Sequence, residues 1–156
     1  MQGLSDYAGW LYGQPGLQSL LLELQDEAGL DVLLLLTACW LGQRPANADA
    51  ALWRSLHASQ TLWQARVIAP LRQVRRALAD EPATSHLYEQ VKACELAVEW
   101  HQLAVLEQTC QPVMASSAEL PEKCMLTHLH FASDGKLDRR IQQLATAALA
   151  AWASRG

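Results

Sequence analysis

The stretch Leu30-Asp-Val-Leu-Leu-Leu-Leu-Thr-Ala-Cys-Trp-Leu-Gly42 decides the fold of this chain. It carries no charge from Val32 to Leu41, and on a helical wheel it is apolar on every side. A helix that is apolar all round must be surrounded by protein or by lipid. At about 1.5 Å per residue, the uncharged run covers roughly half of a bilayer, which favours protein as its surrounding. We therefore expect a central helix that the rest of the chain covers, and this helix leaves the activity open.

The length and composition favour a single domain with a thick core. The chain has 156 residues, of which 51% are hydrophobic. A chain of this length buries about 70% of its unfolded surface, so it can fold without a disulfide or a metal. The net charge of −4 argues against a dedicated nucleic-acid binder, which usually carries a basic domain.

Charge alternates along the chain. Residues 1–43 contain acids but no Lys or Arg, residues 44–80 contain six Arg against two Asp, and residues 81–124 contain seven Glu against two Lys. We expect these segments to neutralise one another when they pack.

The cysteines and the amino terminus indicate a reduced cytoplasm. The four cysteines form no C-x-x-C pair, and Cys39 and Cys94 lie among apolar residues at helical positions, where a free thiol packs as a small hydrophobe. The amino terminus lacks the basic head and the cleavage site of a secretory signal. We expect a cytoplasmic protein without membrane insertion.

Helical periodicity recurs in every long segment. It predicts an all-α, single-domain bundle of about six helices over residues 1–156. Asp31 is expected to cap the central helix at its amino end. Residues 113–133 are expected to be loop-rich, and the part from Glu122 to Ala132 is ambiguous between a loop and a short helix.

Two long patterns predict an antiparallel helical hairpin around a turn near residue 82. Pro70 lies inside the first pattern and should kink that helix, because it lacks an N–H and its ring clashes with the preceding turn. The expected buried stripe of the first helix is Trp53, Leu56, Gln60, Trp63, Val67, Leu71, Val74 and Leu78. The expected stripe of the second helix is Leu87, Val91, Cys94, Val98, His101 and Val105.

Several stretches resemble an uncharacterised proteobacterial family of about this length, a domain of unknown function. They are Tyr12-Gly-Gln-Pro-Gly16, Leu24-Gln-Asp-Glu-Ala-Gly-Leu-Asp-Val32 with Trp40-Leu-Gly42, Trp63-Gln-Ala-Arg-Val-Ile-Ala-Pro-Leu-Arg-Gln-Val-Arg-Arg76, and Val91-Lys-Ala-Cys-Glu-Leu-Ala-Val-Glu99. Together they span roughly residues 7–107. The resemblance implies a small cytoplasmic helical protein, and it carries no activity or catalytic residue to transfer.

Four arginines on the first hairpin helix are the main candidate site: Arg66, Arg72, Arg75 and Arg76. Guanidinium groups that share a helix surface can clamp a phosphate or a carboxylate in a bidentate manner. The alternative is a structural role, in which they pair with glutamates across the hairpin. That register would place Arg66 opposite Glu99 and Arg76 opposite Glu89.

The second hairpin helix carries further candidates. Glu95 and Glu99 lack the Glu-x-x-His spacing of a di-iron site, so no metal or other cofactor is expected there. His101 interrupts the apolar stripe, and we expect it to form a hydrogen bond with Gln60 across the hairpin. Trp100 lies off the hairpin seam and either packs on another helix or belongs to an exposed interface patch.

The carboxyl-terminal third contains two cysteines and two histidines, but not in a zinc-site spacing: Cys110, Cys124, His128 and His130. The sequence also lacks G-x-S-x-G, a Gly-rich phosphate loop and H-E-x-x-H.

Two functions follow as expectations from the whole sequence. The first is a non-catalytic cytoplasmic adaptor or accessory protein that binds a protein partner. A homodimer is compatible with this function. The alternative is a small anionic-ligand binding protein or enzyme with an Arg-lined site between helices. Unpaired arginines beside a pocket would favour the second function, whereas arginines engaged by Glu89, Glu95 or Glu99 would remove its main support.

Overall fold

The chain forms an all-α bundle in the computed structural model, which describes residues 2–44, 46–111, 118–136 and 138–155. The α-helices are α1 (Leu4–Tyr12), α2 (Leu17–Ala28), α3 (Val32–Gln43), α4 (Ala50–Trp63), α5 (Ala69–Leu78), α6 (Ser85–Cys110), α7 (Pro121–Ala132) and α8 (Arg139–Ser154). A π-helical turn, η1 (Gln64–Ile68), joins α4 to α5, and a 3-10 turn, η2 (Pro82–Thr84), precedes α6. The expected all-α fold is confirmed.

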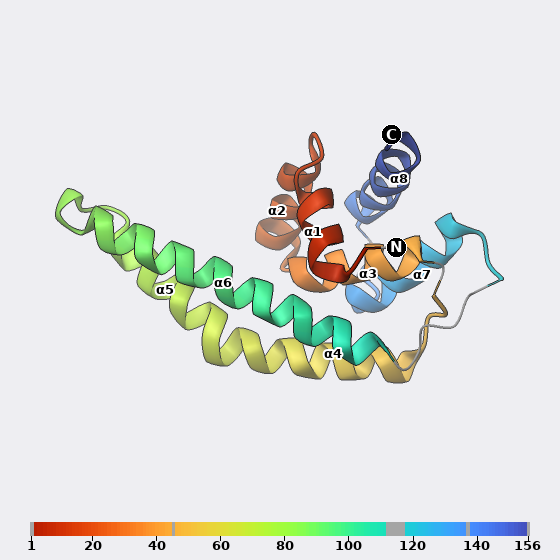
Figure 1. The fold of residues 1–156 in the computed structure, drawn as a ribbon, viewed down its shortest axis with the longest axis horizontal. Helices are drawn as coiled ribbons and strands as arrows, with labels where there is room; N and C mark the ends of the chain where they lie inside the picture. Colours follow the sequence, from red (N-terminus) through yellow and green to blue (C-terminus); the bar gives the residue numbers. More distant parts are fainter. Residues whose placement is uncertain (1, 45, 112–117, 137, 156) are drawn as a thin grey trace.

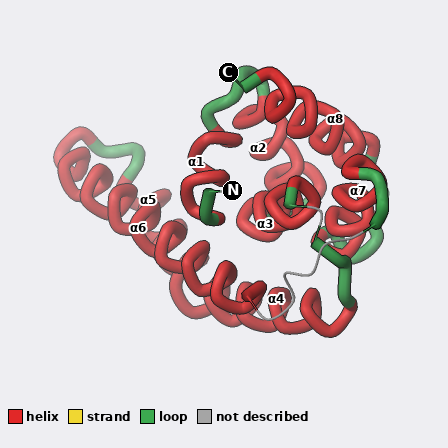
Figure 2. The backbone as a smooth tube through the Cα atoms, turned by 45° about the vertical axis from the view of Figure 1, so that its right-hand side comes forward, coloured by secondary structure: helices red, strands yellow, loops and turns green. Residues whose placement is uncertain are grey.

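Helix α3 is the centre of the bundle. Every residue from Leu33 to Gly42 is buried, as the uniformly apolar sequence predicts. Asp31 caps the helix, since its side chain accepts a hydrogen bond from the backbone N–H of Leu34. Figure 2 shows α3 nearly end-on, with α1, α2, α8, α7 and α4 arranged around it. No helix in the described part of the chain is long and apolar enough to cross a membrane.

The predicted hairpin is present. Helices α4 and α5, joined by η1, run along the whole length of α6, and the α5 end projects away from the other helices (Figure 1). The path of the first hairpin arm changes direction between α4 and α5, where η1 lies (Figure 1). The irregularity expected at Pro70 takes the form of the π turn just before it, which accommodates the missing N–H of proline while the helix continues.

Beyond Trp63 the predicted stripe of the first hairpin helix is wrong at Val74, whereas Val67, Leu71 and Leu78 are half-buried. A π turn holds one residue more than an α turn, so the inward face moves by one position. Ile68 is buried where Val67 was expected, and Arg75 is half-buried while Val74 is 49% exposed.

The predicted stripe on α6 is also wrong by one position in its middle. Cys94, expected to be buried, is exposed, whereas the neighbouring Glu95 is buried. His101 is exposed and Gln102 is buried. The helix is turned toward polar partners on α4 and α5, because Glu95 and Gln102 form hydrogen bonds with these helices.

Within the expected loop-rich segment over residues 113–133, the part that the sequence left open between a loop and a short helix is helical. Residues 121–132 form α7, which packs against α3. Gly42 of α3 allows this close approach, because a Cβ there would lie 2.5 Å from Met125 Cα. Residues 113–117 lie outside the described residues.

Candidate functional site

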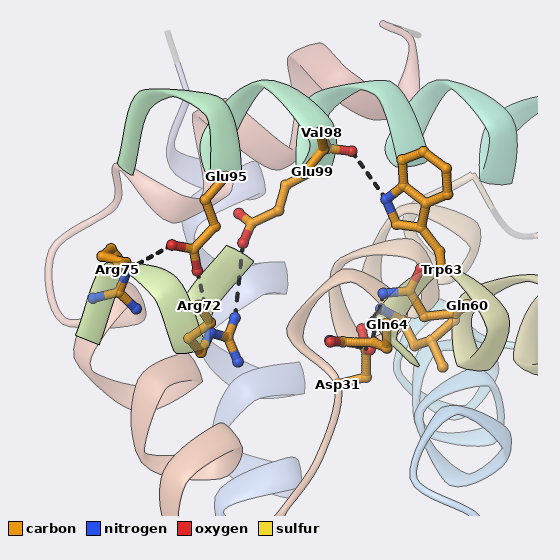
Figure 3. Close-up of polar contacts among 10 residues, drawn as sticks. Asp31, Gln60, Trp63, Gln64, Arg72, Arg75, Glu95, Val98 and Glu99 are labelled. Atoms are coloured by element: carbon orange, nitrogen blue, oxygen red, sulfur yellow. Dashed lines mark hydrogen bonds and ion pairs between the residues drawn. The ribbon is translucent and has the colours of Figure 1, made fainter. Parts of the chain in front are cut away.

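The centre of the candidate site is an ion-pair cluster between α5 and α6 (Figure 3). Glu95, whose side chain is 9% exposed, accepts a hydrogen bond from Arg72 Nε on one oxygen and from Arg75 Nε on the other, at 3.1 and 2.5 Å. Arg72 also lies 3.8 Å from a carboxylate oxygen of Glu99 through its Nη2 atom. We call these four residues the Arg–Glu cluster: Arg72, Arg75, Glu95 and Glu99. The sequence brought the four together as candidates, and the structure places them in contact.

The electrostatics of the cluster are internally balanced. Burial raises the pKa of Glu99, the charge of Glu95 raises it further, and the charge of Arg72 opposes both. The hydrogen bond to Glu95 raises the pKa of Arg75, so this guanidinium stays charged. Two cations and two carboxylates therefore hold one another, and the cluster offers no free charge to a ligand.

The other two arginines lie outside the cluster. Arg66 and Arg76 are exposed, and neither forms an ion pair with another described residue. The predicted pairs of Arg66 with Glu99 and of Arg76 with Glu89 are therefore wrong. The π turn shifts the register of α5 against α6, so Arg72 meets Glu95 and Glu99 instead.

The predicted hydrogen bond between Gln60 and His101 is also wrong. His101 is exposed and its ring lies against Trp63, with 5.4 Å between ring centroids. Trp63 donates through Nε1 to the carbonyl oxygen of Val98 at 3.2 Å (Figure 3). Gln60 turns the other way and donates to Asp31. In this arrangement His101 contacts an aromatic ring rather than an acid or a nucleophile.

Trp100 is 40% exposed and lies apart from the Arg–Glu cluster. The end of its indole ring covers Gly9 of α1, where an added Cβ would lie 3.1 Å from Trp100 Cη2. It therefore packs partly on another helix and leaves the rest of its ring at the surface.

A second polar network involves residues that the sequence did not group together. Asp31 accepts hydrogen bonds at Oδ2 from Gln60 Nε2 at 2.9 Å and from Gln64 Nε2 at 3.1 Å, besides the cap bond at Oδ1 (Figure 3). The available signal was the polar Gln60 within an otherwise apolar stripe. Its partner could not be found from spacing, because Asp31 precedes a different helix.

Of the cysteines and histidines near the carboxyl end, Cys124 and His128 lie together, since both donate to the carbonyl oxygen of Ala46. Cys110, Cys124 and His128 are buried, and His130 is exposed on another side of α7. His128 accepts from Trp53 Nε1 at 3.0 Å and donates to the carbonyl oxygen of Ala46 at 2.8 Å, so both ring nitrogens have protein partners. Burial lowers the pKa of His128. Within the described residues, no three His, Cys, Asp or Glu side chains are grouped to hold a metal ion.

Comparison with known proteins gives the family and no activity. A family model described as a protein of unknown function, DUF2390, matches residues 4–106, which extend from α1 through most of α6. No curated protein and no solved structure matches the chain. The matched region includes the central helix and most of the hairpin, and it confirms the resemblance seen in the sequence. The chain belongs to the DUF2390 family of proteins of unknown function.

Proposed function

We propose that this protein is a non-catalytic accessory protein that binds a partner protein through the projecting end of the α5–α6 hairpin. The isolation of this end is the observation that carries the proposal. No residue of α5 is buried, and its main packing neighbours are α6 and η1 (Figure 1). A helix pair that packs mainly on itself adds little to the bundle, since most helical stability comes from burying an amphipathic face. A contact function explains its length.

The surface of the hairpin supports a protein as the partner. Val74, Leu87 and Leu96 expose about half of their side-chain surface. Val74 and Leu87 lie on either side of the turn that ends the projecting hairpin, and exposed apolar side chains in such a place favour an interaction surface. Arg76 lies near Val74 and is unpaired within the described part of the chain. The partner expected for such a surface has an apolar helix face bordered by carboxylates.

The anionic-ligand alternative has less support. Arg72 and Arg75 are engaged by Glu95, which leaves Arg66 and Arg76. Ten residues separate these two, which corresponds to about 15 Å along a helix. One small anion cannot bridge that distance, so the four arginines do not make a common clamp.

The proposal includes a cytoplasmic location in a bacterium. Cys94 is an exposed thiol, which suits a reducing compartment. The bacterial source comes from the family resemblance alone.

Capture experiments with matched surface variants test the proposal. Val74→Asp combined with Leu87→Asp places charge on the hairpin, and Leu22→Asp places charge on an exposed apolar position of α2 as a control. We expect the wild type and the control to retain the same protein from a lysate of the source cells, and the hairpin variant to lose it with unchanged thermal unfolding. Equal retention by all three would contradict the proposal. If light scattering shows that the wild type is a dimer and that the hairpin variant is a monomer, the partner is a second copy of this chain.

A further inference from the structure

A cleft of about 410 Å³ lies where three segments distant in sequence meet. Its walls come from the turn before α3, from α4 with η1, and from the turn between α7 and α8. The volume is within the range of about 300–1,000 Å³ that is usual for small-molecule pockets. The cleft is separate from the Arg–Glu cluster, and one wall contains the π turn, a feature frequent at functional sites.

The carboxylate of Asp31 lies in this cleft without a cationic partner. Its three hydrogen-bond donors are neutral: the backbone N–H of Leu34 and the side-chain amides of Gln60 and Gln64. It forms no ion pair with any Lys, Arg or His of the described residues. Each carboxylate oxygen can accept two hydrogen bonds, so Oδ1, which accepts one, has a position left for a ligand.

Gln60 adds an unused acceptor to the same wall. The residue lines the cleft and is 1% exposed, and its Oε1 has no hydrogen-bond partner among the described residues. Buried polar atoms are nearly always partnered, and an unpartnered one points to a missing donor. A ligand donor to Asp31 Oδ1 would lie beside this unsatisfied amide, whose Nε2 already donates to Asp31 Oδ2.

The remaining charges of the cleft favour a cation. Asp134 contributes a second carboxylate at the exposed rim, held in the left-handed region at a φ of 53°. Lys136 is the cation of the lining, and its Nζ donates to the carbonyl oxygen of Ala28. His57 donates to the carbonyl oxygen of Phe131 at 2.7 Å and lies 3.6 Å from Asp134. Besides the His57 ring, two carboxylates and one ammonium group line the cleft, so the carboxylates outnumber the ammonium group.

We propose that this cleft binds a small aliphatic amine. One ammonium group donates to Asp31 Oδ1, and the carbon chain lies against the apolar part of the lining, which includes Leu34, Ala65 and Ala69. A second ammonium group, where the ligand has one, reaches the carboxylate of Asp134 at the rim. The charge of Asp31 is then neutralised by the ligand, and the neutral amides of Gln60 and Gln64 orient the carboxylate.

Titration of the whole protein with 1,4-diaminobutane tests the proposal. Amide resonances in 15N-labelled protein are followed at pH 7.5, and 1,4-butanediol, of the same length but uncharged, is the matched control ligand. We expect the diamine to shift resonances of residues 29–34, 57–69 and 132–136, and the diol to shift none. No shifts up to about 10 mM diamine, a concentration that detects binding of about 3 kcal/mol, or equal shifts with the diol, would overturn the proposal.

Three Asp-to-Asn variants locate the binding. Asp31→Asn should weaken diamine binding by about tenfold, the effect of losing one charge-assisted contact of about 1.4 kcal/mol. Asp134→Asn should weaken it by about threefold, since the rim carboxylate is exposed, and Asn tolerates the left-handed backbone. Asp26→Asn, at an exposed position of α2, should bind as the wild type does. Unchanged affinity in Asp31→Asn contradicts the site, and if that variant does not fold, unchanged affinity in Asp134→Asn does so.

Discussion

One methyl group at position 42 tests how closely α3 and α7 pack. A Cβ on Gly42 would lie 2.5 Å from Met125 Cα and 2.6 Å from Met125 Cβ. Carbon atoms are in favourable contact at about 3.5–4.0 Å, so α7 has to retreat by about 1 Å in Gly42→Ala. Over-packing costs about 1–3 kcal/mol, and the upper end applies because the obstacle includes backbone. The helix preference of Ala over Gly returns about 1 kcal/mol. We expect a net loss of about 2 kcal/mol.

Urea unfolding followed by circular dichroism measures this loss. With a slope of about 1–3 kcal/mol per molar urea, the midpoint should fall by about 1 M. Gly13→Ala is the matched control, since Gly13 has a φ of −81° and the nearest atom to its added Cβ is 3.5 Å away. The control should change the free energy of unfolding by less than about 0.5 kcal/mol. A Gly42→Ala protein at least as stable as the wild type would refute the close packing of α7 on α3.

Three further predictions concern buried polar groups and thiols. Glu95→Ala should lower the free energy of unfolding by about 2 kcal/mol. This loss is less than the roughly 3–5 kcal/mol for breaking a fully buried pair, because water reaches the arginines. The control Arg76→Ala, at an exposed position, should change the free energy by less than about 0.5 kcal/mol in the same urea titration. Because the pKa of His128 is lowered, the unfolded chain binds a proton that the folded chain does not. The free energy of unfolding should therefore fall as the pH drops below about 6.5. Urea titrations at pH 7.5 and 5.5 should show this decrease in the control variant His130→Gln but not in His128→Gln. A thiol reagent should label Cys94 in the folded protein, and it should label the buried Cys39, Cys110 and Cys124 only in urea. Mass spectrometry counts the labelled thiols. Labelling of all four thiols at one rate, or a pH dependence that survives His128→Gln, would contradict these assignments.

The central helix and the hairpin could be predicted because their signals are local. The uncharged run is buried on all sides from Leu33 to Leu41 because it has no polar face to turn toward water. Asp31 caps this helix as expected, since an N-cap depends only on the next three residues. The antiparallel pairing of α5 with α6 follows from a short turn between two long amphipathic helices.

The faces of the hairpin helices could not be predicted, because a π turn has no spacing signal of its own. Pro70 is compatible with a kink, a helix end or a π turn, and each of these leads to a different face for the residues that follow. The packing of α7, whose residues the sequence left open between a loop and a short helix, could not be predicted for another reason. Its contact with α3 depends on the absence of a side chain at Gly42, a property of two segments far apart in sequence.

The π turn connects the two proposals through a single geometric cause. By adding one residue before α5, it moves Arg72 and Arg75 onto the face toward Glu95 and leaves Val74 and Arg76 at the surface. The same turn presents Gln64 to Asp31, and together with Gln60 it holds the carboxylate in the cleft. An uninterrupted α-helix would carry the same residues but would aim them differently. The pairing of Arg72 and Arg75 with Glu95 and the contact of Gln64 with Asp31 therefore have the same structural cause. The proposed amine would accordingly meet the carboxylate of Asp31 in the cleft, although the most basic segment of the chain forms one wall of the site.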